Sequence, residues 1–130
     1  MTRMAILPLN LRTAAVKNGA GMIIRDVPST VTDWRQAPIE ERPGETGRAM
    51  WQTLEIGNIR VRMVEYSPGY SADHWCTRGH VLLVTQGELI IDLKDGRTFV
   101  LGPGMTYQVA SDAEPHRPST RTGAALFIVD

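Results

Sequence analysis

Turn-forming residues interrupt this chain at short intervals, and this spacing constrains the fold more than any other feature. Twelve glycines and eight prolines are spread through 130 residues, with short apolar and β-branched runs between them. Chains with this pattern fold into many short strands joined by tight turns. We therefore predict an all-β domain with one hydrophobic core, either a sandwich or a closed barrel.

The strand signals are clearest in the second half of the chain. Within 59–66, apolar residues alternate with Arg60 and Arg62, which is the period of a strand with two different faces. Gly57-Asn58 and the segment 94–97 have the composition of hairpin turns. We expect strands over 50–56, 59–66, 80–85, 88–93, 98–101, 105–110 and 124–129, and a loop over 111–122.

The first 48 residues carry a weaker pattern. We expect a short helix over 11–17, a strand over 22–27 and a loop over 43–47. A chain of 130 residues is long enough for one hydrophobic core and not for two. We therefore interpret residues 1–48 as an N-terminal arm that packs on a barrel formed by residues 49–130.

Charge and cysteine content exclude several classes of protein. Fourteen basic and fourteen acidic residues cancel, so the composition argues against a nucleic-acid or membrane-surface partner. A single cysteine, Cys76, cannot form a disulfide within the chain. We see no signal peptide and no apolar run near the roughly 18 residues of a membrane span, and we expect a cytoplasmic protein.

The chemistry of the chain is concentrated in four residues. His74, His80 and His116 are its only histidines, and its only cysteine, Cys76, lies between the first two. Strand periodicity would place His74 and Cys76 on one face and Trp75 on the other. Imidazole and thiolate are common ligands of zinc and other transition metals. A single buried histidine is more often a core residue, so spacing alone leaves a metal site and coincidence about equally open.

The segment from Pro68 to Gly87 resembles the first motif of the cupin superfamily. In that motif a Pro-Gly turn leads to two histidines one residue apart, then to a glutamate and a glycine. Here Pro68-Gly69 leads to His74, and Cys76 stands where the second histidine is usual. His80 takes the place of the glutamate, and Gly87 follows six residues later.

The second cupin motif, a Pro-x-Gly or similar turn followed by one histidine, resembles Gly102-Pro103-Gly104 and His116. The resemblance implies a cupin double-stranded β-helix, or jelly-roll barrel, with a metal at four occupied ligand positions. It also implies a homodimer. Over 46–130 the chain is more closely similar to the DHCW-motif cupins, a group without an activity known to us. That similarity rests on 60–70, 72–76, 79–80, 95–97, 115–117 and 126–130.

The ligand set favours zinc, and iron, copper, nickel or manganese remain alternatives. If His74, Cys76, His80 and His116 all bind one ion, the site is closed, as in structural zinc sites. If Cys76 stands off, three histidines leave a position for water or substrate. The sequence does not decide between these two arrangements.

Other polar residues are candidates for the surroundings of the metal. Arg60 and Arg62 either point into the barrel and hold an anionic substrate or form a solvated strand face. Tyr70 and Tyr107 are candidate cavity walls. Asp73 is a candidate for orienting a ligand histidine, or a simple turn residue, and Arg117 for shaping the cavity mouth.

These observations leave three functional hypotheses. The first is a metal-dependent enzyme acting on a small organic molecule, with isomerase, lyase, hydrolase and dioxygenase activities not distinguished. The second is a non-catalytic metal- or ligand-binding protein, or a redox sensor with a closed His/Cys zinc site. The third is a structural zinc in a domain that contacts a partner. Fold identity does not choose among them.

Overall fold

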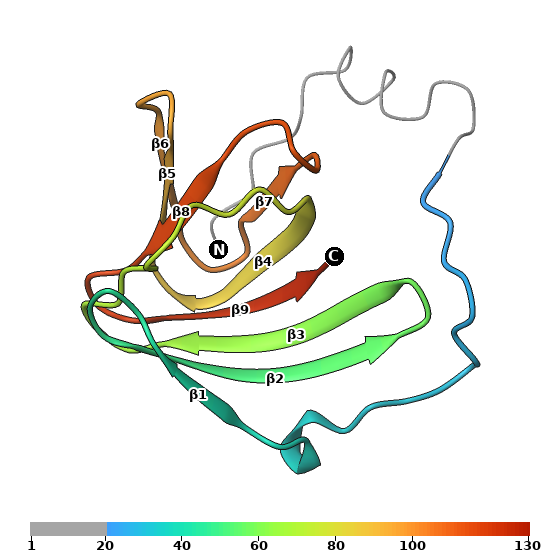
Figure 1. Cartoon of the computed structure of the whole chain (residues 1–130). Helices are drawn as coiled ribbons and strands as arrows, with labels where there is room; N and C mark the ends of the chain where they lie inside the picture. The colour runs from blue at the N-terminus through green and yellow to red at the C-terminus, as the bar shows by residue number, and fades with distance from the viewer. Residues whose placement is uncertain (1–20) are drawn as a thin grey trace.

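The structure, a computed structural model, describes residues 21–130 and is almost entirely β (Figure 1). The helix predicted over 11–17 lies outside the described residues. One 3-10 helix, η2 (Trp34–Gln36), precedes the strands. The strands are β1 (Glu40–Pro43), β2 (Arg48–Ile56), β3 (Ile59–Tyr66), β4 (His80–Gly87), β5 (Leu89–Leu93), β6 (Thr98–Leu101), β7 (Thr106–Val109), β8 (His116–Ser119) and β9 (Ala124–Val129).

The strands form two antiparallel sheets. The larger sheet has the order β1-β2-β3-β9-β4-β7, and the smaller has the order β6-β5-β8. In Figure 1 the small sheet stands across one end of the large one. Strand β9, late in the sequence, pairs with both β3 and β4, so the chain returns to the middle of the large sheet. This is a jelly-roll β fold, and the predicted fold class is confirmed.

Alternation along the strands builds the core. In β9 the buried residues are Ala124, Leu126 and Ile128, and the residues between them are partly exposed. The smaller sheet contributes Leu89, Ile91 and Leu93 from β5 in the same way. Residues two apart in a strand share a face, so both sheets turn one apolar face toward the interior.

Two sequence predictions about secondary structure are wrong. Residues 111–122 are not a continuous loop, because they contain β8, which pairs with β5. Pro118 lies within this short strand, and proline is tolerated there because β8 is at the edge of its sheet. Residues 22–27 form no strand, because Asn58 of the β2–β3 turn binds the backbone of Ile23 and Arg25.

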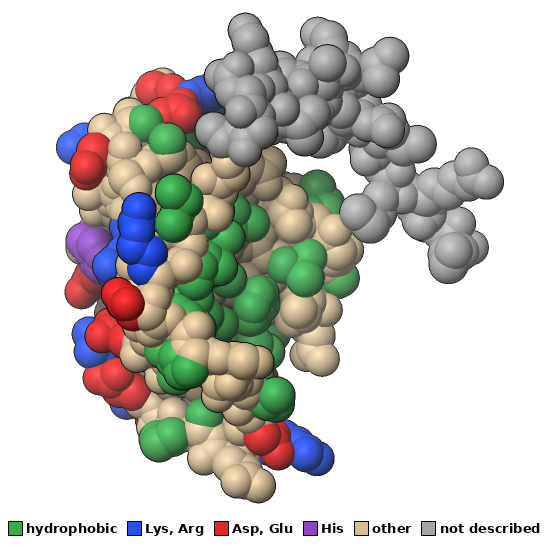
Figure 2. Space-filling view, turned by 90° about the vertical axis from the view of Figure 1, so that its right-hand side faces the viewer, with side chains coloured by type: hydrophobic (Ala, Val, Ile, Leu, Met, Phe, Trp, Pro, Cys, Tyr) green, Lys and Arg blue, Asp and Glu red, His purple; other side chains and the backbone are tan. Residues whose placement is uncertain are grey.

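The outer surface also carries apolar side chains. Ile59, Val81, Val109 and Val129 line a groove together with Met22. Figure 2 shows hydrophobic side chains gathered along the middle of one face, with charged side chains beside them. Across residues 21–130, no helix has the length and apolarity needed to cross a membrane.

The core predicts a contrast between two truncations to alanine. Leu126 is 1% exposed and Val100 is 52% exposed. We expect Leu126→Ala to lower the free energy of unfolding by about 2–5 kcal/mol, because it removes buried methyl groups and leaves a cavity. Val100→Ala should change it by less than about 0.5 kcal/mol. Urea denaturation followed by fluorescence measures both, and equal losses would contradict this assignment of the core.

Candidate metal centre

The inner face of the large sheet changes from apolar to polar at one end. Pairing aligns Val64, Leu126 and Val84 across β3, β9 and β4, and the next row is Arg62, Ile128 and Leu82. The row after that contains Arg60, Asp130 and His80. Arg60 and Asp130 exchange backbone hydrogen bonds of 2.6 and 2.9 Å. His80 lies one residue beyond the pair of Val81 and Val129.

The opposite side of the site comes from the edge of the small sheet. His116 is the first residue of β8 and is 1% exposed. Its backbone exchanges two hydrogen bonds with Cys76, of 2.7 and 3.0 Å. Cys76 and His116 are therefore cross-strand neighbours, and their separation is set by the backbone rather than by side-chain rotamers alone.

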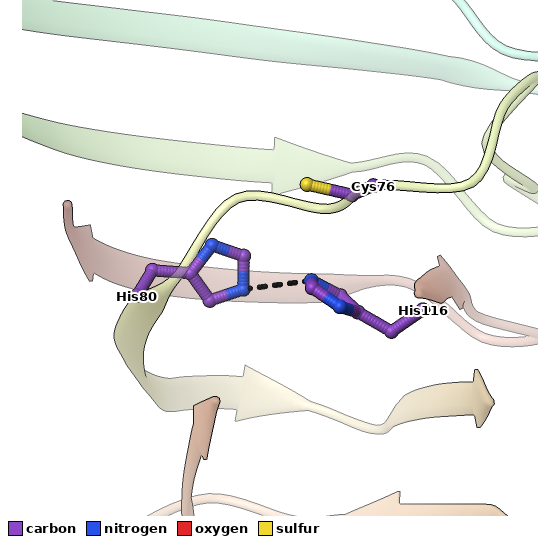
Figure 3. A group of neighbouring side chains, drawn as sticks. All are labelled: Cys76, His80 and His116. Atoms are coloured by element: carbon purple, nitrogen blue, oxygen red, sulfur yellow. Dashed lines mark hydrogen bonds between the residues drawn. The ribbon is translucent and has the colours of Figure 1, made fainter. Parts of the chain in front are cut away.

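These elements bring three metal-ligating side chains together. One ligand atom each from Cys76, His80 and His116 lies within 4.8 Å of the others. The Nε2 atoms of His80 and His116 are 3.1 Å apart, and Figure 3 shows the two imidazole rings pointing at one another with the thiol beside them. Two imidazole nitrogens bound to one tetrahedral zinc ion would be about 3.3 Å apart. The observed spacing therefore fits a shared ion.

The surroundings of the far side of each ring support the same conclusion. The Nδ1 of His116 donates to the carbonyl oxygen of Glu114 at 3.0 Å, which leaves a lone pair on Nε2. The Nδ1 of His80 is buried without a hydrogen-bond partner and lies 3.7 Å from Oδ2 of Asp130. With a proton on that Nδ1, His80 also presents a lone pair at Nε2. Two facing lone pairs repel each other unless a proton or a cation lies between them.

Asp130 is the acidic group behind the ligands, and its side chain is 1% exposed. Burial alone would raise the pKa of this carboxyl, but the His80 imidazole and the guanidinium groups of Arg60 and Arg62 hold it well below its usual range. Asp130 is therefore ionised. Its negative charge lies 3.7 Å from Nδ1 of His80, which favours a proton on that nitrogen and a lone pair on Nε2.

Cys76 has the character of a ligand rather than of an inert core thiol. Hydrogen bonding with His116 lowers the pKa of its thiol, against the opposing effect of burial. The same pairing raises the pKa of His116, although burial works in the other direction. A thiol with a lowered pKa is more easily deprotonated, and the thiolate is the form that binds metals.

The cluster opens into a cavity of about 350 Å³. Cys76, His80 and His116 all line it, and Leu82 and Ile128 form part of its apolar wall. This volume lies at the lower end of the range for small-molecule sites. The arrangement can thus hold an ion with a small organic molecule beside it.

His74 is not part of the three-residue cluster. The chain bends at Asp73 and His74, so strand periodicity does not apply there, and Trp75 lines the cavity instead of facing away from it. His74 also lines the cavity, but its side chain is 72% exposed. Asp73 accepts a hydrogen bond from its Nδ1 at 2.7 Å, and this contact lowers the pKa of Asp73.

The remaining predicted residues lie around the cluster at different depths. Arg60 and Arg62 line the cavity and bind Asp130, so the arginine face of β3 is the inner one. Tyr70 lines the cavity and stacks on Tyr66 with ring centroids 4.1 Å apart.

Tyr107 and Arg117 contact the site from its margins. Tyr107 packs beside the imidazole rings of His80 and His116, with centroid distances of 6.4 and 5.6 Å. Arg117 lies over the ring of Trp75 at 4.8 Å, at the wall of the cavity.

The sequence patterns gave no role to Asp130, which directly follows the strand predicted over 124–129. A signal for it exists in the alternation of β9. Leu126 and Ile128 belong to the buried face, so residue 130 falls on that face too. A charged residue at an inward position is a site candidate, because buried charges require partners.

Comparison with known proteins identifies the fold. No protein-family model matches the chain, and no curated protein matches it. Solved structures do match. An RmlC-like cupin from Shewanella frigidimarina has a TM-score of 0.66 at 20% identity, over 78% of this chain and 89% of the other. Ectoine synthase from P. lautus has a TM-score of 0.64 at 15% identity, over 77% and 75%.

A third match is Fe(II)-HppE with an alternative substrate, with a TM-score of 0.63 at 14% identity, over 78% of this chain and 59% of the other. The chain spans only 46% of the length of a matched DMSP lyase structure. At these identities the likeness concerns the fold, and the chain has the cupin fold. The narrower similarity to DHCW-motif cupins stays a prediction.

The position of Asp130 behind His80 predicts its effect on metal affinity. Asp130→Asn keeps the shape but removes the negative charge, so His80 becomes a weaker ligand and the arginines repel a cation. We expect metal affinity to fall roughly 10–100-fold. Competition with a coloured chelator measures this, and the exposed Asp95→Asn serves as the control. Unchanged affinity in Asp130→Asn would contradict the role of the carboxylate.

Proposed function

We propose that this cupin-fold protein binds one divalent metal ion through Cys76, His80 and His116 and is an enzyme acting on a small organic molecule in the adjoining cavity. The observation that carries the proposal is the pair of facing Nε2 atoms, 3.1 Å apart, with the thiol of Cys76 beside them. The hydrogen bond from His116 to Glu114 and the position of Asp130 behind His80 both favour rings whose Nε2 atoms face a shared ion.

Three protein ligands support a catalytic rather than a structural site. Structural zinc is bound by four protein groups, whereas catalytic zinc keeps one position for water or substrate. When bound, such an ion supplies Lewis acidity, polarising a substrate oxygen or lowering the pKa of a water molecule. The cavity beside the cluster gives this position access to a ligand.

Structures with the same fold are consistent with an enzyme. They include ectoine synthase, Fe(II)-HppE and DMSP lyases. A thiolate with two imidazoles favours zinc. Iron is an alternative for this site, because HppE, which has the same fold, is an Fe(II) protein. The reaction class stays open among isomerase, lyase, hydrolase and dioxygenase.

His74 supports the second candidate, a closed zinc site with a sensing role. It lines the same cavity, and its exposed side chain is free to rotate once its hydrogen bond to Asp73 breaks. A fourth ligand would exclude substrate, and oxidation of Cys76 would then release the ion. Homodimer formation and a cytoplasmic location remain predictions from the sequence.

Metal content of four proteins tests the proposal. We expect the wild type, purified without added metal, to hold about one zinc ion per chain, and His116→Ala to hold almost none. Cys76→Ser should retain a larger share than His116→Ala, because two imidazoles remain. His74→Ala should retain the full content if the site has three ligands. Elemental analysis measures all four.

Each result has a defined consequence. Equal metal content in the wild type and His116→Ala would disprove the site. Loss of metal in His74→Ala would favour the closed site and a sensing role. The absorption spectrum of the cobalt-substituted protein adds an independent check, since a thiolate-to-cobalt band that disappears in Cys76→Ser shows directly that the sulfur is a ligand.

A further inference from the structure

Positive charge exceeds negative charge around the cavity. Arg60 binds Asp130 through Nε and Nη2 at 2.9 and 3.0 Å, and Arg62 binds it through Nη2 at 3.2 Å. The Nε of a third arginine, Arg78, lies 3.8 Å from the same carboxylate. One carboxylate therefore faces three guanidinium groups, and none of the residues that line the cavity is Asp or Glu.

Arg60 and Arg62 each have guanidinium N–H groups without a hydrogen-bond partner in the described part of the chain. Asp130 uses only part of each guanidinium group, and Nη1 of Arg60 and of Arg62 has no partner among residues 21–130. The Nε of Arg62 is also buried without a partner. Arg62 is only 8% exposed. Burial, together with the nearby charge of Arg60, lowers its pKa. A buried cation in this state gains stability from a further anion.

The cavity lining beside the arginines is apolar. Leu82, Leu126 and Ile128 lie on the same inner face of the large sheet as Arg62, and Ile91 of β5 lines the cavity from the small sheet. The ring of Trp51 packs against Arg62 with the guanidinium carbon 5.1 Å from the ring centroid. A ligand that fits this lining has one anionic group and a small apolar body. Because Asp130 Oδ2 contacts both Arg62 and His80, an anion on the arginines would lie close to the metal ligands.

We infer that the substrate of this site is a small carboxylate, bound by Arg60 and Arg62 with its apolar part toward Leu82 and Ile128. The description of this carboxylate as a substrate rests on the proposed function. The anion site itself does not require the metal. A planar carboxylate offers two oxygens to two free guanidinium donors. A phosphate ester would carry a second charge, and burying it beside this apolar lining costs more than burying a single carboxylate.

The indole signal of Trp51 reports binding at this position. In ¹H–¹⁵N spectra the chain gives indole signals from Trp34, Trp51 and Trp75, and Trp51→Phe identifies the relevant one. Butyrate, butyramide and inorganic phosphate are titrated separately into metal-free and zinc-loaded protein. We expect butyrate to shift the Trp51 signal to saturation in both forms, and butyramide, which has the same shape without the charge, to leave it in place.

Variants separate the arginines from general charge. Arg62→Lys should weaken butyrate binding about tenfold or more, equivalent to about 1.4 kcal/mol. Arg60→Lys should also weaken butyrate binding. Because Arg60 is less buried than Arg62, this second variant tests the site even if Arg62→Lys misfolds. Arg42→Lys is the matched control, because Arg42 also lies over Trp51, at 4.8 Å, but outside the cavity lining.

The outcomes distinguish this inference from the proposed function. Equal shifts with butyrate and butyramide, a response to phosphate alone, or no response at all would overturn the carboxylate assignment even if the protein holds its metal. Saturable butyrate binding in a protein that binds no metal would uphold the anion site and refute the metal-dependent enzyme.

Discussion

The buried carboxylate of Asp130 is the interaction on which the rest of the site depends. It follows β9, the strand that joins β3 to β4, and its backbone pairs with that of Arg60. Without this carboxylate Arg62 would be a buried and unpaired cation, which is one of the most costly arrangements in a protein interior. The same group faces His80, so one carboxylate both partly neutralises the buried arginines and lies behind a candidate ligand histidine.

The apolar core and the polar site are parts of one continuous surface. Successive rows across β3, β9 and β4 run from Val64, Leu126 and Val84 to the row that holds Asp130. The apolar rows fix the register, because a slip of one residue would turn every inner side chain outward. The geometry of the site is therefore secured by hydrophobic burial several ångströms away from it.

The sequence was sufficient for the fold and for part of the site. Alternation and turn residues located β3 and β9. The scarcity of histidine and cysteine singled out four residues, and three of them, Cys76, His80 and His116, lie together. Alternation separates two faces without saying which is the inner one, so the inward arginines stayed undecided. His74 was placed by strand periodicity in a segment that bends, and bends depend on tertiary contacts that a local pattern does not contain.

The paired backbones of Cys76 and His116 have a consequence for the range of ions this fold can serve. Two main-chain hydrogen bonds fix the distance between these positions. The side chain at position 76 can therefore be replaced by one with a harder or softer donor atom while the backbone geometry stays the same. A sulfur donor there favours softer ions, and an imidazole or carboxylate would favour harder ones. The preference of this site for one ion over another would thus depend on the side chain at position 76, while the backbone pairing that positions it stays unchanged.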